Sequence, residues 1–548
     1  MSKSLHGLYG SDPRLLSPVA ARLAQRGLLK WVIAITAALG AILEVIDTSI
    51  VNVAMPDIQG NLGVTLSEVG WISTGYACAN VVMIPLTAWL SDRFGRKTYL
   101  IFSLIGFTVS SVLCGLSANL GMLIASRVMQ GLCGGGLLAK AQSLIFETFP
   151  RNEQPAAQAF FGIGVIAGPA FGPVLGGYLT DTLGWRWIFF INLPVGILAV
   201  IAAVIFLPRD EESQLTHDYI DWAGIGLLTL GLACFQIMLE EGQQEDWFAS
   251  DFIIMMAVGA VVGSVLFIWR ELTIDHPAVD LRVLRHRSLV GGGIYSLVLG
   301  MGMYGVMFAV PVFVQNYLHF TATQSGYLLM PGALASAAMM VVMSKVTGRV
   351  DARVLIAGGA LITVLTAFLL SDINPSSSAE SLFWPLILRG VGTVMMFLPL
   401  SLATLGDLPK KDIGPGAGFY NLTRQMGSSI GIALLTTLLV HREAAHRAVL
   451  VEHIHATGGG PLNSIRMFGS ALTTRLQMFD FLFIFRHGDA VRAQQQALKV
   501  VDYTINSQSA LLSFADVFRY VGYAFLITLP LLFLLGQGRN KAAAAASH

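Results

Sequence analysis

The chain has 548 residues, of which 54% are hydrophobic and 12% are charged; its 34 Lys and Arg residues and 33 Asp and Glu residues leave a formal net charge of +1. Soluble domains carry about 25% charged residues, so this composition excludes an ordinary water-soluble protein. We expect no nucleic-acid partner, no metal and no cofactor. The sequence also lacks a GxxxxGK[ST] phosphate loop, which argues against nucleotide use and leaves an ion gradient as the driving force.

Apolar runs of about 20 residues, the length needed to span a bilayer, recur along the whole chain. We predict spans near 31–52, 70–90, 99–117, 121–146, 156–179, 187–207, 222–240, 252–269, 289–315, 326–343, 354–371, 384–405, 417–440 and 517–536. The sequence therefore predicts an all-α polytopic membrane protein with fourteen transmembrane helices. The first span follows a polar leader of 30 residues and is too long for a signal-peptide core, so we expect it to be retained.

The distribution of basic residues predicts the orientation of these helices. Lys and Arg concentrate in alternate loops, whereas Arg186 is the one basic residue in the six short loops on the other side. Cytoplasmic loops retain basic residues, so both termini are predicted to be cytoplasmic. All four cysteines fall within spans, where we expect packing rather than a disulfide or a zinc site.

A weak internal repeat predicts how the chain is divided. The segment 120–136 enters the fourth span with a lone Arg127, and the segment 382–397 enters the twelfth with a lone Arg389. The offset of eight helices fits two six-helix halves separated by an inserted helix pair, and parallel repeats of this kind are typical of transporters. The predicted segments are a cytoplasmic N-terminal segment (1–30), the first half (31–207), the inserted pair (208–270), helices 9 to 13 (271–440), a long outer loop that is helical in part (441–516), and helix 14 with a cytoplasmic tail (517–548).

Two carboxylates, Glu44 and Asp47, interrupt the first span. Residues three apart lie on one face of a helix, so both side chains look into the same space. At 1.5 Å per residue, Asp47 lies roughly 7 to 13 Å below the outer end of its helix and Arg127 roughly 9 Å below the end of its own. These depths allow an ion pair between Asp47 and Arg127, and leave Glu44 deeper and less compensated.

Two interpretations of these carboxylates stay open. Asp47 alone is equally well explained as a structural residue held by Arg127, Thr48 and Asn52. A second carboxylate on the same face is too costly for packing alone. For the pair we therefore favour proton uptake and release.

The fifth span contains a stripe of glycines at intervals of four, with two prolines beside it. Its members are Gly164, Gly168, Pro169, Gly172, Pro173 and Gly176. Such a stripe allows close backbone packing, and prolines soften the helix. Helix packing is the plainer interpretation, and a smooth interface that rocks is the functional one.

The loop "SDRFGRK" (91–97) is short and basic, with Gly95 at its turn. In the repeat scheme it lies opposite "GPGAGFYNLTRQ" (414–425), which begins the thirteenth span on the cytoplasmic side. Asp92 is predicted to dock on the positive end of that helix dipole and so to act as a latch that closes the cytoplasmic side.

Several of these segments resemble the major facilitator superfamily. "AWLSDRFGRK" (88–97) resembles its motif A, "LIASRVMQGLCGGG" (123–136) its motif B, and the stripe of the fifth span its antiporter motif C. "LEVIDTSIVNVAMP" (43–56) and "GWRWIFFINLPVG" (184–196) are similar to signatures of the fourteen-helix drug:proton antiporters of the EmrB and QacA type. Glu44 before "VID" is closest to the EmrB-type branch. One departure is Ala88, where motif A usually has Gly.

The resemblance implies a major facilitator fold and proton-driven export of lipophilic, drug-like compounds across the inner membrane by alternating access. It implies proton coupling by Asp47 and Arg127, beside Glu44, and a gating loop formed by Asp92, Arg93, Gly95, Arg96 and Lys97. For the EmrB-type branch it implies a periplasmic adaptor protein and an outer-membrane channel as partners. The counterpart loop, 344–353, keeps Gly348 and scattered basic residues, so a second gate there is not expected.

Polar and aromatic residues in the spans are candidates for contact with hydrophobic, cationic or amphipathic substrates. They are Glu44, Gln236, Tyr304, Phe308, Phe313, Gln315, Tyr327 and Met330. A proton-coupled uptake symporter is the alternative, but it needs more polar residues at mid-depth than the spans offer. A membrane enzyme, the third class considered, would need a cluster such as His217, Asp218 and Asp221, which a solvated loop explains better; we expect no enzyme.

Overall fold

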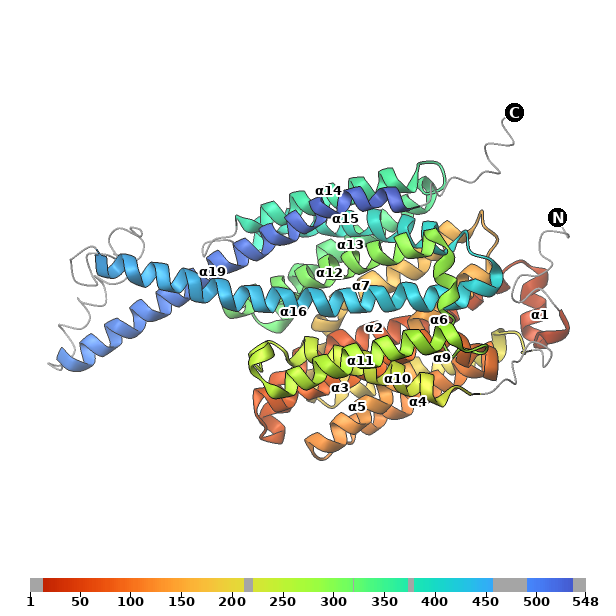
Figure 1. Ribbon diagram of the computed structural model, residues 1–548, viewed down its shortest axis with the longest axis horizontal. Helices are drawn as coiled ribbons and strands as arrows, with labels where there is room; N and C mark the ends of the chain where they lie inside the picture. The colour runs from red at the N-terminus through yellow and green to blue at the C-terminus, as the bar shows by residue number, and fades with distance from the viewer. Residues whose placement is uncertain (1–12, 211–219, 319, 373–378, 457–489, 536–548) are drawn as a thin grey trace.

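The architecture comes from a computed structural model, which describes residues 13–210, 220–318, 320–372, 379–456 and 490–535. These residues form helices, and the only β-type pairing among them is an isolated bridge between Thr347 and Val350. Most helices run side by side along the long axis of the molecule (Figure 1). An all-helical bundle satisfies the backbone donors and acceptors within each segment except at the helix ends, as a span in hydrocarbon requires.

The first half contains six spans, two of which are broken into paired helices. Their bounds are α2 (Leu29–Leu62), α3 (Leu66–Phe94), α4 (Arg96–Gly115), α5 (Leu120–Gly134) with α6 (Leu137–Thr148), α7 (Gln154–Leu183), and α8 (Trp187–Phe190) with α9 (Asn192–Phe206). A short helix, α1 (Pro18–Gln25), precedes them. Each break starts a new helix inside the bundle, and the first N–H groups of that helix are free to bind a side chain.

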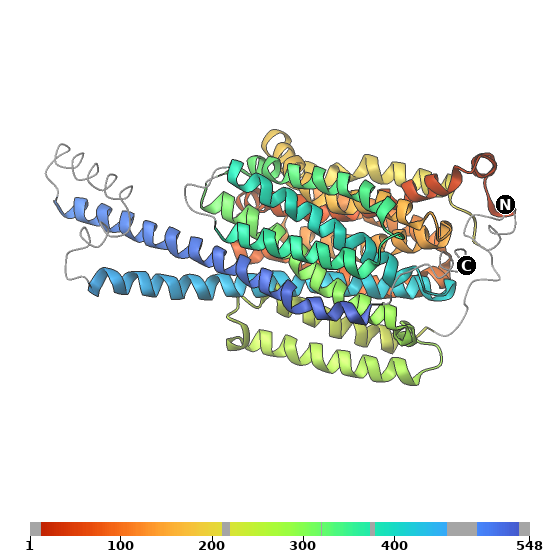
Figure 2. The same ribbon diagram turned by 90° about the horizontal axis from the view of Figure 1, so that it is seen from above.

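The rest of the chain forms an inserted pair and a second half. The pair is α10 (Trp222–Glu241) and α11 (Asp251–Thr273), and the second half is α12 (Arg287–Asn316), α13 (Ala322–Val346), α14 (Ala352–Ser371), α15 (Ala379–Leu405), α16 (Lys410–Ala456) and α19 (Ala490–Thr528). The inserted pair packs on α3 and α16, and α11 lies at the edge of the bundle (Figure 2).

The two halves pack their helices in the same order, as the sequence repeat predicts. In the first half α2 packs on α7, α3 on α5, and α4 on both α5 and α9. In the second half α12 packs on α16, α13 on α15, and α14 on both α15 and α19. The halves meet where α7 lies against α13 and α3 against α16. Arg127 and Arg389 therefore occupy equivalent helices, α5 and α15.

Thirteen helices of the described chain are long and apolar enough to cross a membrane. The fourteenth predicted span lies in α16, which runs among the others but carries Asn421, Arg424 and Gln425 and is more polar. Both α16 and α19 continue beyond the bundle at the end away from α1 (Figures 1 and 2). The segment expected as a long outer loop thus begins and ends as helix, while its residues 457–489 lie outside the described part.

Candidate functional site

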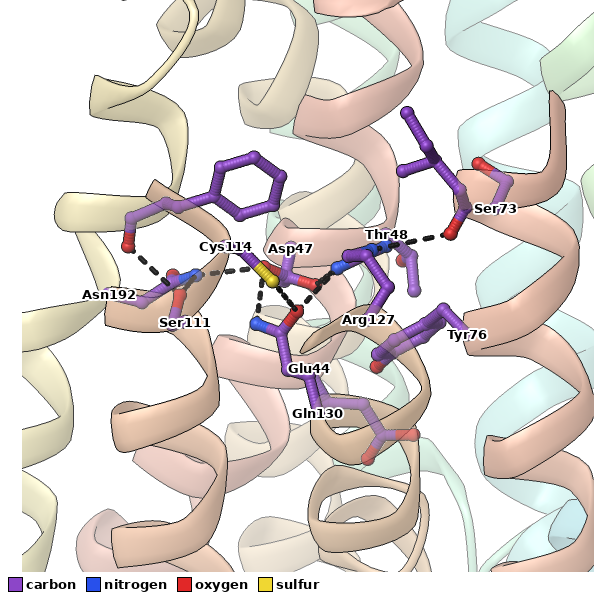
Figure 3. Close-up of polar contacts among 12 residues, drawn as sticks. Glu44, Asp47, Thr48, Ser73, Tyr76, Ser111, Cys114, Arg127, Gln130 and Asn192 are labelled. Atoms are coloured by element: carbon purple, nitrogen blue, oxygen red, sulfur yellow. Dashed lines mark hydrogen bonds and ion pairs between the residues drawn. The ribbon is translucent and has the colours of Figure 1, made fainter. Parts of the chain in front are cut away.

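Asp47 lies at the centre of a buried polar cluster between α2, α5 and α9. Its Oδ2 accepts a hydrogen bond from Arg127 Nη1 at 2.5 Å, and its Oδ1 accepts from Gln130 Nε2 at 3.0 Å and from Asn192 Nδ2 at 2.8 Å (Figure 3). The side chains of Asp47 and Arg127 are 0% and 1% exposed. The ion pair that their matched depths allow is present in the structure.

The guanidinium of Arg127 has partners on several sides. Its Nη1 also donates to Gln130 Oε1 at 2.6 Å, and its Nε donates to the Ile72 carbonyl at 3.4 Å. Its Cζ lies 4.2 Å from the centre of the Tyr76 ring, within the range of a cation–π contact. A buried charge is tolerated when it is paired and hydrogen-bonded, and both members of this pair meet that condition.

Sequence reasoning missed two partners of Asp47 and named two wrongly. Gln130 follows Arg127 by three residues and so shares its helix face, and Asn192 begins α9 after the break that follows α8. Thr48 instead donates to the Val45 carbonyl, and Asn52 accepts from Ser73. The expected contacts of Thr48 and Asn52 with Asp47 were therefore wrong.

Glu44 is buried one turn deeper and has a different environment. Its Oε1 accepts from Asn80 Nδ2 at 2.9 Å, and its Oε2 accepts from the backbone N–H of Leu138 at 2.9 Å. Leu138 is in the first turn of α6, so the carboxylate sits at the positive end of a helix dipole. No Lys, Arg or His among the described residues forms an ion pair with Glu44.

The glycines at the α5–α6 break make this contact with Glu44 feasible. The break falls at Gly135 and Gly136, in the "CGGGLL" stretch of motif B. A Cβ at Gly135 would lie 2.6 Å from the Asn80 carbonyl oxygen, closer than atoms approach. Gly135 therefore lets α5 approach α3 at Asn80, and the break frees the N–H that Glu44 binds.

The motif A loop is held by a residue that the motif does not include. Gly95 has φ +92°, and the carboxylate of Asp210 accepts from the backbone N–H groups of Lys97 at 3.1 Å and Thr98 at 3.2 Å. Asp210 thus caps the N-terminus of α4. The Nζ of Lys97 donates to the carbonyls of Val204 and Leu207, which ties the loop to the end of α9.

The remaining motif A residues lie near the ends of the helices. Arg96 pairs with Glu147 at 2.8 Å, and the Arg93 guanidinium lies 5.9 Å from the Trp89 ring centre. Asp92 lines a cavity of about 350 Å³ together with Gly414, at the start of α16. Within the described chain Asp92 makes no hydrogen bond to α16, so the latch stays a prediction.

The glycine stripe of motif C packs α7 on α2, within the first half. Gly164 faces Ile42, Gly168 faces Val45, and Gly172 and Gly176 face Ser49 and Ile50. A different face of α7 meets the second half, where Gly177 approaches Thr323 and Val174 approaches Gly326. Pro169 lines an interior cavity between the halves.

The residues proposed for substrate contact do not gather at one place. Gln236 is buried and donates to Ser429 and Glu240, while Phe313 is buried against Tyr317 and Phe514. Phe308 and Tyr327 are exposed, Gln315 and Met330 are half-buried, and the side chain of Tyr304 lies outside the described part. Of the side chains in this set that the structure describes, none lines the two cavities that adjoin Arg389.

Asp221 is the one described residue of the cluster considered for a membrane enzyme, and its contacts are structural. Both oxygens of Asp221 accept from Arg270, and Asp221 also caps α10 through Gly224 N–H at 2.9 Å. His217 and Asp218 lie outside the described residues. Asp221 is therefore a structural anchor for α10 and α11.

Two six-helix halves, an ion pair buried between helices and a second buried carboxylate define a polytopic membrane transporter. The sequence model of the Major Facilitator Superfamily matches residues 37–432. The chain belongs to this superfamily.

Several curated proteins of this superfamily are similar to the chain along most of its length. The chain is 34% identical over 418 residues to "Multidrug export protein EmrB" of Haemophilus influenzae, covering 76% of this chain and 82% of that protein. It is 32% identical over 502 residues to the protein of the same name from Escherichia coli K12, covering 91% and 94%. It is 29% identical to "Fatty acid resistance protein FarB" of Neisseria gonorrhoeae, covering 92% and 96%.

A solved structure supports the fold. The human organic anion transporter MFSD10 superimposes with a TM-score of 0.56 at 13% identity, covering 90% of this chain and 99% of that one. The predicted family and fold are therefore confirmed.

Proposed function

We propose that this chain exports hydrophobic and amphipathic drug-like compounds across the inner membrane in exchange for protons. Export is supported by the multidrug export proteins that it resembles along most of its length. Proton exchange is supported by one observation above all: Glu44 is buried beside the Asp47–Arg127 pair and forms no direct ion pair with any described residue.

The two carboxylates have different roles in this proposal. The negative charge of Asp47 is balanced by the positive charge of Arg127, so Asp47 stays ionised. Its contacts hold α2 against α5 and α9. Among the described residues Glu44 is held by an amide, a backbone N–H and a helix dipole rather than by a direct ion pair, and these contacts cost less to give up than an ion pair. Glu44 is therefore the group that binds and releases the coupled proton, and Asp47 with Arg127 sets the electrostatic field around it.

The motif A loop and the membrane orientation complete the proposal. Both termini are cytoplasmic, the cavity lined by Asp92 and Gly414 lies at the cytoplasmic gate, and the halves rock about the α7–α13 and α3–α16 contacts. The extensions of α16 and α19 form the surface for a periplasmic adaptor protein, through which an outer-membrane channel is reached.

Drug-triggered proton release from proteoliposomes with an acidic lumen tests the exchange. The native protein, inserted with its cytoplasmic face outward, is expected to release lumenal protons when drug is added outside. Glu44→Gln is expected to abolish this release, and Asp47→Asn to reduce it strongly. Glu245→Gln, which changes an exposed carboxylate in the α10–α11 connection, is the matched control.

Each contrary outcome has a defined meaning. Native protein that is well folded and releases no protons with any drug overturns antiport. Drug and protons that move in the same direction indicate the uptake symporter instead. Release that persists in Glu44→Gln assigns Glu44 a structural role.

A further inference from the structure

Arg389 differs from Arg127 in having no acidic partner among the described residues. The two arginines occupy the equivalent helices α15 and α5, but the helix equivalent to α2 is α12, which places Met303 and Met307 near Arg389 rather than a carboxylate. Across the described chain the Arg389 guanidinium has neither an ion-pair nor a hydrogen-bond partner. An uncompensated charge within a span is costly and marks a functional site.

The side chain of Arg389 instead lines two adjoining cavities. Met303 and Thr393 line both of them as well. One of the two lies between the halves, because α7 contributes Ile166 and Pro169 to it. Both cavities have the mostly apolar lining that is typical of small-molecule sites.

The polar groups of these cavities predict the charge of the ligand. No acidic side chain of the described residues lines either cavity. The lining hydroxyls of Ser336, Thr363, Thr366 and Thr393 each donate their one hydrogen to a carbonyl of their own helix. The guanidinium of Arg389 is therefore the side-chain donor left for a ligand, and its match is an anionic acceptor.

We propose that Arg389 binds the anionic head group of amphipathic substrates, such as alkyl or aryl carboxylates, whose apolar body lies along Met303, Met307 and Pro169. This inference rests on the proposed export function and names a substrate class for it. An anionic substrate supplies the charge partner that Asp47 supplies to Arg127. It bridges the halves at α7 and α15, so its binding depends on their relative position.

Equilibrium binding to the purified full-length protein in detergent tests this site without a proton gradient. The probes are a dansyl-labelled alkyl carboxylate, its uncharged methyl ester and a quaternary-amine analogue of the same length. The native protein is expected to prefer the carboxylate. Arg389→Gln is expected to weaken carboxylate binding by about 10- to 100-fold, the effect of one lost hydrogen bond to a charged group, and to leave the ester unchanged.

Two further variants keep the test decisive. Thr393→Glu places a carboxylate one turn from Arg389, where it is expected to pair with the guanidinium and exclude the carboxylate probe while the ester still binds. Arg519→Gln removes an exposed arginine outside both cavities, so it is expected to change nothing. This variant controls for the loss of a positive charge in general.

The outcomes separate this site from the transport function. The proposed site is wrong if the carboxylate binds native protein and Arg389→Gln with equal affinity. It is also wrong if Arg389→Gln loses binding of the carboxylate and of the ester to the same extent. If the carboxylate does not bind but a cationic drug triggers proton release, only the anion site is wrong. If the carboxylate binds through Arg389 and no drug releases protons, the site stands and the antiport proposal falls.

Discussion

Arg127 and Asp47 form a direct ion pair at 2.5 Å with both side chains withdrawn from solvent. Removing one partner strands the other charge inside the bundle, which costs about 3–5 kcal/mol. We therefore expect Arg127→Met to lower the thermal unfolding temperature of the purified protein strongly.

The double variant Asp47→Asn with Arg127→Met removes both charges and is expected to be more stable than Arg127→Met alone. Arg519→Met, in an exposed pair with Asp516 at 3.6 Å, is expected to change stability by less than about 1 kcal/mol. A double variant as unstable as the single one would contradict a role for the pair in stability.

Gly135 brings α5 close to α3 at the point where Asn80 binds Glu44. Gly135→Ala would place a methyl group 2.6 Å from the Asn80 carbonyl, so it is expected to displace Asn80 and to reduce drug-triggered proton release. Gly226→Ala is the matched control, because a Cβ there meets nothing within 4 Å. Equal release by both variants would show that the close approach at Gly135 is dispensable.

Gly95 is expected to be essential for two separable reasons. Gly95→Ala imposes the cost of a positive φ and also collides with Asp210. Gly348, in the counterpart loop, has φ +100° and open space around it, so Gly348→Ala carries the backbone cost alone. Transport measured in both should fall much further in Gly95→Ala. Asp210→Asn is expected to weaken the cap of α4 by about 1 kcal/mol.

The proposed cytoplasmic gate is expected to be locked by a disulfide between positions 88 and 414. A Cβ built on Gly414 lies 3.6 Å from the Ala88 Cβ, which suits a disulfide, whose Cβ atoms lie about 3.8 Å apart. In a background with the four native cysteines replaced, Ala88→Cys with Gly414→Cys is expected to cross-link under oxidation and to stop transport until a reductant is added. Each single-cysteine variant should be insensitive to oxidant. Full transport by the cross-linked protein would show that this contact does not open.

The depth of a side chain in the membrane could be predicted from the sequence, but the direction in which it points around its helix could not. Counting residues from the helix ends was enough to match Asp47 with Arg127. Asn80, the partner of Glu44, and Asn192, the partner of Asp47, were not predicted. Their positions depend on the rotation of α3 and α9 about their axes and on the breaks before α6 and α9. The "CGGGLL" stretch could have predicted the backbone contact of Glu44, since three glycines in a span indicate a helix break with free N–H groups. The sequence identified Arg389 as a charge within a span. That it has no charge partner among the described residues depends on which side chains α12 places opposite it.

The extension of α16 has a mechanical consequence. The helix that packs against α12, α3 and α6 inside the bundle runs on without interruption to Ala456, and Arg442 and Arg447 tie it to Asp516 and Asp502 of α19. Residues 441–456 span about 24 Å, so a tilt of about 10° at the membrane displaces the tip by about 4 Å. The extension is thus a lever that reports the position of the second half to any protein bound at its tip. The distance between spin labels at position 456 and on α3 should change when substrate is added. An unchanged distance would show that the extension does not move with the second half.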